Sequence, residues 1–255
     1  MVPDIGKIDS PERMSKAIRT LGIVPFFRNG IPGWSIEELT DPGCWFTSSE
    51  ELGPWDWKID VVREGDIAYG KFLGGKAAFA TVGWYRHFMN WRRSLPRYRM
   101  ALGEDFTART ASDRLMQMLS PAVLKAIREN GALEASEIRK ICSAIYPATK
   151  KATADNVVSF LQMGTWSVIG DFRRVYRGAN LEYSGWQRAS NTTPDDLFGK
   201  KDSDAGAPFW AKMFEESTKD SLEVKEKPDE SRELIKSHIL SICGRQYGDL
   251  LDRII

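Results

Sequence analysis

Cysteine and histidine are scarce in this chain of 255 residues, and their scarcity excludes several kinds of site. The three cysteines, Cys44, Cys142 and Cys243, are far apart and odd in number, which is typical of neither a disulfide framework nor a zinc cluster. Two histidines, His87 and His238, are too few for a His-rich metal site. We therefore expect no metal and no cofactor, and the cysteine usage favours a cytoplasmic protein.

The sequence also lacks a long hydrophobic run and an excess of charge of either sign. No apolar run approaches the length that crossing a bilayer requires, and residues 1–14 hold no apolar core of the signal-peptide kind, so no membrane partner is expected. The 36 Lys and Arg residues are balanced by 35 Asp and Glu residues, which leaves a formal net charge of +1. A nucleic acid would therefore have to be held by a local basic patch and not by the field of the whole molecule.

The N-terminal part of the chain combines a helix with a segment rich in tryptophan. An N-cap serine, a following proline and helical spacing of apolar residues predict a helix over 11–21. The segments 67–72 and 77–82 flank a Gly-Gly turn, which predicts a β-hairpin. We expect residues 53–62 to lead into the same small antiparallel sheet. Six of the nine tryptophans lie in residues 34–91, so this part should have a strongly aromatic interior.

The middle of the chain predicts three short helices followed by a β-hairpin. The helices are indicated by helical spacing of apolar residues over 120–130, 135–144 and 150–163. Strand-like segments at 166–176 and 181–188 follow, separated by a turn. This order is that of a winged helix, although periodicity alone also allows a helical bundle with an appended hairpin.

These patterns predict an α+β protein in three parts. Residues 1–111 form an N-terminal helix and a Trp-rich antiparallel sheet, and residues 112–199 form a winged-helix domain whose wing is a β-hairpin. Residues 200–255 form a charged C-terminal extension with an amphipathic helix.

Basic side chains gather in three places that could hold nucleic acid. The second helix of a helix-turn-helix pair presents its N-terminal side chains to the bases, and here these are Lys150, Lys151 and Asn156. Arginines that could hold phosphates lie in the wing and in the stretch 84–99: Arg173, Arg174 and Arg177, and Arg86, Arg92, Arg93 and Arg97. We place Asn156, Arg92 and Arg93 on the surface. The alternatives are that these faces are merely solvated, that they contact protein, or that the arginines pair with acidic residues around 215–220.

The tryptophan-rich segment holds a candidate pocket. Trp55 and Trp57 could stack on an extruded base, and Asp56 between them is the candidate catalytic carboxylate. The competing interpretation is that these tryptophans fill the core, because tryptophan is the largest core residue.

Two runs of sequence resemble a known family. The first is WF…GPWDWK…AYGKF…GKAAF…W, from Trp45 to Trp84, and the second is FLQMGTWSVIGDF…YSGW…TPDDLFG, from Phe160 to Gly199. Together they resemble the AlkZ-related proteins, which are winged-helix relatives of the AlkZ-type DNA glycosylases. The resemblance implies a winged-helix fold and DNA as the partner.

The resemblance carries over no catalytic pair. AlkZ-type glycosylases remove alkylated or crosslinked bases with a Gln-x-Gln or Gln-x-Asp pair on a strand that follows an N-terminal helix. In this chain that segment, 23–27, reads Ile-Val-Pro-Phe-Phe, and apolar side chains can neither orient a water nor stabilise charge on the sugar. We therefore predict a DNA-binding relative that lacks this pair. The alternatives are an active repair glycosylase that uses another residue, such as Asp56, and a non-enzymatic protein-interaction module.

Overall fold

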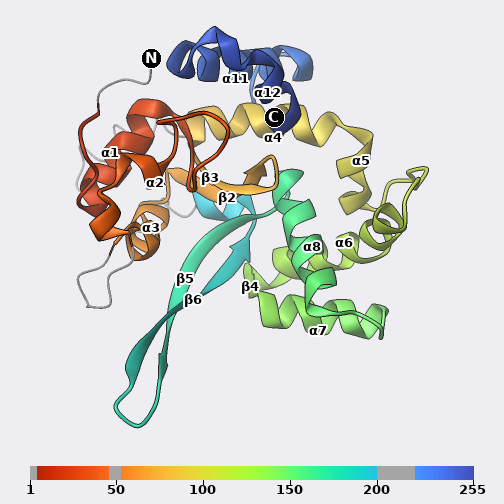
Figure 1. Cartoon of the computed structure of the whole chain (residues 1–255). Helices are drawn as coiled ribbons and strands as arrows, with labels where there is room; N and C mark the ends of the chain where they lie inside the picture. Colours follow the sequence, from red (N-terminus) through yellow and green to blue (C-terminus); the bar gives the residue numbers. More distant parts are fainter. Residues whose placement is uncertain (1–4, 46–52, 200–221) are drawn as a thin grey trace, which may run out of the picture.

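The computed structural model of the chain describes residues 5–45, 53–199 and 222–255, apart from the side chains of residues 184 and 185. These residues form an α+β fold, which confirms the predicted class. Two three-stranded antiparallel sheets lie within them, each covered by helices (Figure 1). None of the helices in the described ranges combines the length and the apolar character that crossing a bilayer requires.

The first sheet and its helices come from the N-terminal part of the chain. Helix α1 begins after Ser10, whose Oγ accepts a hydrogen bond from the backbone of Arg13 at 3.2 Å, and it ends at Gly22, as predicted. The predicted hairpin is confirmed, because β2 pairs with β3 across Gly74 and Gly75, which both have positive φ. Strand β1 adds to the free side of β3, so the strand order is β1-β3-β2. The elements are α1 (Pro11–Leu21), β1 (Ile23–Pro25), α2 (Ile36–Leu39), η1 (Pro42–Cys44), α3 (Pro54–Arg63), β2 (Ile67–Leu73), β3 (Lys76–Thr81), α4 (Val82–Ser94), α5 (Pro96–Arg99) and η2 (Met100–Leu102).

Residues 53–62 correct one prediction, because they form helix α3 and not an approach to a strand. Gly53 precedes the helix, and Pro54 occupies its first turn, where the fixed φ of proline is already helical and its missing N–H costs nothing. The β-branched residues at 59–62 favoured a strand, but Ile59, Val61 and Val62 are buried against the core in a helical arrangement. Tertiary packing therefore outweighs the local strand preference.

The second sheet belongs to the middle of the chain. Its strand order is β4-β6-β5, so a short strand that the sequence did not indicate, β4, pairs with the second strand of the long hairpin. Figure 1 shows this hairpin extending away from the body of the molecule. The elements are α6 (Ala111–Asn130), β4 (Ala132–Glu134), α7 (Ala135–Ile145), α8 (Lys151–Met163), β5 (Val168–Arg177) and β6 (Glu182–Thr192).

Helix α6 begins earlier than predicted. Thr110 and Asp113 form a capping box at its N-terminus, so the helix starts well before the predicted start at 120. Pro121 lies inside the helix, and Ser120, at the predicted start, is buried, with its Oγ donating to the carbonyl of Met116 at 2.6 Å. A Ser-Pro pair resembles a helix start, but here the apolar spacing continues on both sides of it.

The C-terminal elements pack on the N-terminal part. They are α9 (Pro194–Gly199), α11 (Pro228–Cys243), η4 (Arg245–Tyr247) and α12 (Gly248–Ile254). Helix α11 lies along α4 (Figure 1). The ring of His238 on α11 stacks on that of Trp84 on α4, with ring centroids 3.9 Å apart. His238 also makes a hydrogen bond of 2.8 Å to the backbone carbonyl of Leu21. The C-terminal helices are thus joined to the first sheet and its helices, while the division of the chain into three parts stays a prediction.

The buried side chains form two hydrophobic cores. The first core unites α1, α3, α4 and the first sheet with the start of β5 and with α11 and α12. The second core joins α6, α7 and α8 with Tyr98 and Trp166. Trp57 is buried in the first core, in agreement with the core interpretation, whereas Trp55 is partly exposed at its edge.

Candidate functional site

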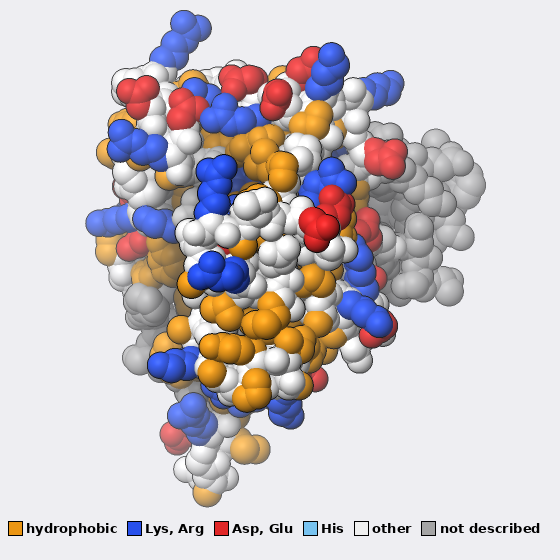
Figure 2. All heavy atoms as spheres, turned by 90° about the vertical axis from the view of Figure 1, so that its right-hand side faces the viewer, with side chains coloured by type: hydrophobic (Ala, Val, Ile, Leu, Met, Phe, Trp, Pro, Cys, Tyr) orange, Lys and Arg blue, Asp and Glu red, His pale blue; other side chains and the backbone are white. Residues whose placement is uncertain are grey.

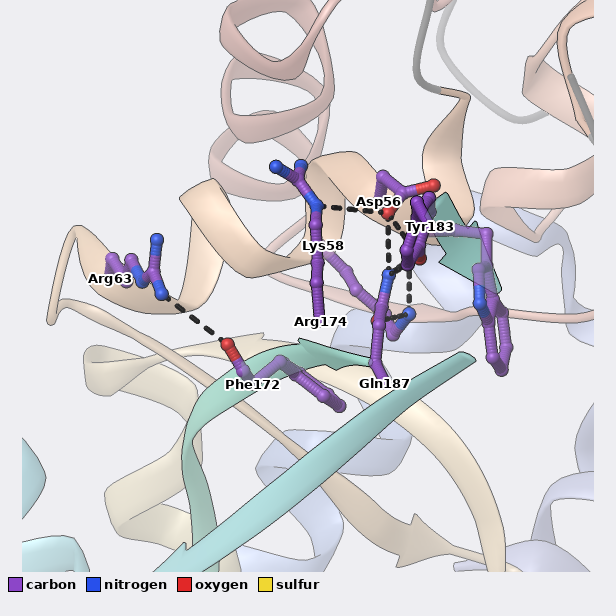
Figure 3. A network of polar contacts seen from close by, with 8 residues as sticks. Asp56, Lys58, Arg63, Phe172, Arg174, Tyr183 and Gln187 are labelled. Atoms are coloured by element: carbon purple, nitrogen blue, oxygen red, sulfur yellow. Dashed lines mark hydrogen bonds and ion pairs between the residues drawn. The ribbon is translucent and has the colours of Figure 1, made fainter. Parts of the chain in front are cut away.

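A cluster of polar side chains lies where the hairpin β5–β6 crosses the first turns of α3 (Figure 3). Helix α3 contributes Asp56 and Lys58, and the hairpin contributes Arg174, Tyr183 and Gln187. The contact joins segments more than 115 residues apart in the chain, since Asp56 and Arg174 are separated by 118 positions. Asp56 lies in the first turn of α3, where the partial positive charge of the helix terminus favours a carboxylate.

Asp56 is a buried carboxylate that the hairpin holds in place. Its Oδ1 accepts hydrogen bonds from Tyr183 Oη at 2.7 Å and from Gln187 Nε2 at 2.8 Å. The same oxygen forms an ion pair with Arg174 Nε at 3.3 Å. Burial, together with the hydrogen bond to Asp56, raises the pKa of Tyr183 to about 12, so the phenol stays a hydrogen-bond donor. The carboxylate is thus fixed from three sides by groups of the hairpin.

Lys58 is a buried amine in a largely aromatic setting. Only 1% of its surface is exposed, and its Nζ lies 3.6 Å from the ring centroid of Trp55 and 4.8 Å from that of Phe172. Nζ donates hydrogen bonds to the backbone carbonyl of Trp55 and to Oε1 of Gln187. Among the described residues, no carboxylate forms an ion pair with Nζ. The pKa of Lys58 is lowered to about 7, mainly by burial; the charge of Asp56 opposes this shift, and the charge of Arg174 adds to it.

The cluster therefore contains an amine that can lose its proton near neutral pH beside a fixed carboxylate. A neutral amine can act as a nucleophile or as a base, and a lysine normally gains this ability only when burial penalises its charged form. Strongly shifted pKa values in such a cluster are typical of functional sites, although structural networks also produce them. In the described part of the chain, no group of three or more His, Cys, Asp or Glu side chains comes together to hold a metal ion.

The N-terminus of α8 presents its predicted contact residues to solvent. Lys150, Lys151 and Asn156 are all exposed. Lys151 lies beside a surface hollow between α7, α8 and β6, which Arg139 and Arg188 also line. Within the described ranges, no carboxylate forms an ion pair with Lys150 or Lys151. These side chains are therefore placed where the sequence predicted and are available to a partner.

The hairpin β5–β6 carries exposed aromatic and basic side chains toward its tip. Trp186 is 64% exposed and Tyr176 52%, and Arg177 is also exposed. The other two predicted wing arginines have acidic partners: Arg173 forms an ion pair with Glu134 at 2.7 Å, and Arg174 binds Asp56. The exposed part of the hairpin thus presents aromatic side chains and one of the three predicted wing arginines, Arg177, whereas its base is engaged with α3.

The surface placement of Arg92 and Arg93 is wrong. Arg92 is 3% exposed, its guanidinium lies 4.4 Å from the ring centroid of Trp91, and it donates to Tyr98 Oη at 3.0 Å. Arg93 is half-buried and donates to the backbone carbonyl of Thr165 at 2.7 Å. The reason is that α4 lies between the first sheet and α11, so most of its circumference is covered. The acidic residues around 215–220 lie outside the described residues.

The two other candidate arginines of the stretch 84–99, Arg86 and Arg97, are partly engaged within the protein. Arg86 is half-buried, and Arg97 lies 3.4 Å from a carboxylate oxygen of Asp113. On the face shown in Figure 2, the described Lys and Arg side chains are scattered among acidic and apolar side chains. That face therefore shows no single continuous basic patch.

Two residues of the cluster, Lys58 and Gln187, were missed as site residues by sequence reasoning. A lysine inside the aromatic run GPWDWK was a signal, because few lysines are buried without a reason. The pairing of α3 with the hairpin left no local pattern, since Lys58 and Gln187 are 129 positions apart.

Comparison with known proteins identifies a family whose model matches the residues of these sites. The family model described as AlkZ related matches residues 8–255, which is nearly the whole chain. No curated protein and no solved structure matches the chain. The matched residues include both cores, the polar cluster on α3 and the exposed N-terminus of α8.

Proposed function

Because the chain belongs to the AlkZ-related family, we propose that it binds nucleic acid, with DNA as the expected partner, through a winged helix. The proposed unit consists of α6, β4, α7, α8 and the hairpin β5–β6, in that order. This order, with a short first strand paired to the last, is that of a winged helix in which α8 is the recognition helix. The observation that carries the proposal is the exposed, polar N-terminus of α8.

The proposed contacts divide into two kinds. Lys150 and Lys151 hold phosphates at the start of α8, and Asn156, one turn later, reaches a base edge. Arg177 holds a phosphate from the wing, where Trp186 is exposed and can stack on a base. Phosphate contacts supply most of the affinity, and base contacts supply preference among sequences.

Ion pairs within the protein limit the number of these contacts. Arg173 and Arg97 can still exchange their carboxylates for phosphates, because each arginine side chain is more than half exposed and a surface ion pair contributes only about 0–1 kcal/mol. Arg92 and Arg93 are withdrawn from the proposed contacts, since their guanidinium groups bind Tyr98 and the backbone of Thr165. We therefore expect a modest affinity that depends on a few charges.

Excision of bases by the family's glutamine pair is not part of the proposal. The segment after α1 is β1, whose three residues Ile23–Pro25 are all buried and apolar. Phe26, which follows, is also fully buried. The side chains of β1 and of Phe26 therefore offer no polar atom to a water or a sugar.

The affinity for duplex DNA should fall steeply with salt. Three or four phosphate contacts release a matching number of counterions, which gives a slope of about −3 to −4 in a plot of log K against log salt concentration. Fluorescence anisotropy with a labelled duplex at 25–200 mM salt measures this slope. Binding that does not change with salt would contradict the proposal, and so would the absence of binding at the lowest salt.

Removing both lysines of α8 should weaken binding to every DNA sequence by a similar amount. Lys150→Ala with Lys151→Ala eliminates two of the proposed phosphate contacts, so the magnitude of the salt slope should drop by up to about two. The matched control is Lys16→Ala with Lys76→Ala, which removes two exposed lysines from α1 and β3. Equal losses in the two double variants would show that α8 is not the contact surface, and the protein-interaction alternative would then be preferred.

A further inference from the structure

A surface hollow of about 440 Å³ lies between α7, α8 and β6, at the base of the hairpin. Three basic side chains line it, one from each of these elements: Arg139, Lys151 and Arg188. Two carboxylates, those of Glu134 and Asp155, line it as well. The hollow thus adjoins the proposed recognition helix and holds cations that the contacts proposed above use only in part.

Glu134 holds two arginines of the hairpin beside this hollow. Arg173 and Arg188 are directly opposite each other on β5 and β6, so their side chains leave the sheet on the same face. Nε and Nη2 of Arg173 donate to Oε1 of Glu134 at 3.0 and 2.7 Å, and Nη1 of Arg188 lies 3.6 Å from Oε2. Like charges at opposite positions repel, so the two guanidinium groups need an anion beside them. In the structure Glu134 is that anion.

We propose that the hollow binds a phosphate of a DNA strand, and that Glu134 takes the place of this phosphate in the free protein. The proposal rests on the DNA binding proposed above, which brings the strand to α8 and the hairpin. A phosphate, like a carboxylate, presents anionic oxygens that accept two parallel hydrogen bonds from a guanidinium. Arg173 and Arg188 pass from Glu134 to the phosphate, and Arg139 and Lys151 add positive charge from α7 and α8. Glu134 is therefore a built-in competitor of DNA.

The exchange of partners needs little rearrangement. The side chains of Arg173 and Arg188 are 61% and 55% exposed, and ion pairs at such positions contribute little to stability. Release of the Glu134 carboxylate leaves the start of α7 in place, because the carboxylate of Glu137 still accepts the backbone N–H of Glu134 at 2.8 Å. Asp155 forms no ion pair with a cation of the described residues, so it does not hold either arginine.

Glu134→Gln is expected to tighten the binding of duplex DNA about three- to tenfold at low salt, because it removes the competitor and keeps the length of the side chain. The two arginines then neutralise phosphates without setting free a charged carboxylate. The magnitude of the salt slope should therefore rise by about one to two. Fluorescence anisotropy with the labelled duplex measures both quantities.

A second substitution at the same position guards against a loss of fold. Glu134 is the N-cap of α7, and Glu134→Ser supplies a favoured N-cap residue without the charge. It should tighten binding as Glu134→Gln does. Circular dichroism shows which variants are folded. A folded Glu134 variant that binds the duplex no more tightly than the wild-type protein would overturn the proposal.

The matched control is Asp252→Asn. Asp252 also holds two cations, Arg232 at 2.9 Å and Lys236 at 2.7 Å. These residues belong to α11 and α12, which lie at the opposite end of the molecule from α7 (Figure 1). The control changes the net charge by the same amount, yet its affinity should stay within about twofold of the wild-type value, because distant charges are screened. A gain as large as that of Glu134→Gln would show that only net charge matters, and the proposal would fall.

The gain must also depend on the two arginines. In a protein that carries Arg173→Ala and Arg188→Ala, Glu134→Gln has no arginine to release, so the affinity should rise by less than about twofold. A full gain in this background would contradict the role of Glu134 as competitor.

The same measurements keep this proposal apart from the DNA binding on which it rests. Wild-type protein that binds the duplex, with folded Glu134 variants that bind it no better, would overturn the phosphate site alone. The absence of binding by all these proteins at the lowest salt would overturn both proposals. Inorganic phosphate alone should show no saturable binding by isothermal titration calorimetry, because a single ion lacks the contacts of the rest of the strand. Phosphate binding that Glu134→Gln strengthens, with an unchanged affinity for DNA, would overturn the strand as the ligand.

Discussion

Lys58→Met is expected to make the protein more stable near neutral pH. The pKa of Lys58 falls from 10.5 to about 7 on burial, which corresponds to a cost on the order of 4 kcal/mol at pH 7, from about 1.36 kcal/mol per pKa unit. Methionine has a similar length and suits the aromatic surroundings. The variant loses the hydrogen bonds to Trp55 and Gln187, which reduces this gain in stability by about 1–2 kcal/mol. A net gain of about 2 kcal/mol in the free energy of unfolding remains.

The pH dependence of this gain identifies its cause. Between pH 7 and 10.5, the unfolded lysine binds a proton that the folded one has lost, so the stability of the wild-type protein rises with pH over this window. The cost of Lys58 is full below pH 7 and fades toward pH 10.5. The advantage of the variant should therefore shrink by about 2 kcal/mol between pH 7 and pH 9.

Urea denaturation of both proteins at several pH values between 6.5 and 9 measures the difference. The control is Lys71→Met, whose curve should follow that of the wild-type protein at every pH. Curves for Lys58→Met and the wild-type protein that stay parallel would show that Lys58 keeps its ordinary pKa in the folded protein. A residue that lowers stability where it stands is typical of a site kept for function.

Arg92→Ala is expected to destabilise the protein by about 3 kcal/mol. The substitution empties the space between Trp91 and Tyr98 and leaves Tyr98 Oη without its donor, and both a cavity and an unpaired buried group are costly. The contrasting variant is Arg92→Met, which fills the space. Among the described residues, Arg92 Nε has no hydrogen-bond partner, and burial lowers the pKa of the guanidinium, so its charge contributes little to stability.

Thermal and urea unfolding of the two Arg92 variants separate packing from charge. Arg92→Met should lose less than half as much stability as Arg92→Ala, because its side chain keeps the contact with Trp91. Arg97→Ala, at an exposed position on α5, serves as the control and should change stability by less than about 0.5 kcal/mol. An Arg92→Ala protein as stable as this control would mean that Arg92 lies on the surface after all.

The elements that could be predicted from the sequence are those whose ends or turns carry a local signal, such as an N-cap residue or a pair of glycines. The N-cap at Ser10 and the glycines at 74 and 75 act within a few residues, so α1 and the β2–β3 hairpin could be predicted. Strand β4 has three residues and depends on its pairing with β6, which lies more than 50 positions later, so it gave no signal of its own. Residues 53–62 were misread for the same reason, because their helix is decided by packing against the core and not by a local signal.

The candidate site was predictable only in part. Exposure at the start of a helix follows from its polar residues, so Lys150, Lys151 and Asn156 were placed correctly on the surface. A basic helix looks the same in sequence whether solvent or another helix covers it, and Arg92 was therefore misplaced. Asp56 was chosen as a carboxylate between two tryptophans, but its partners come from a hairpin over 115 residues away.

The stack of His238 on Trp84 also bears on how the chain reaches its folded state during synthesis. The ribosome makes α1 long before α11, yet His238 binds the carbonyl of Leu21 across 217 positions, and Ile235 and Ile239 complete the same core. Closing so long a loop is slow, whereas α6, α7 and α8 join neighbours in the chain. We therefore expect the middle helices to fold first on the ribosome. Until α11 is synthesised, the strands of the first sheet keep part of their aromatic side chains exposed to solvent. We therefore expect this segment to have the greatest need of a chaperone.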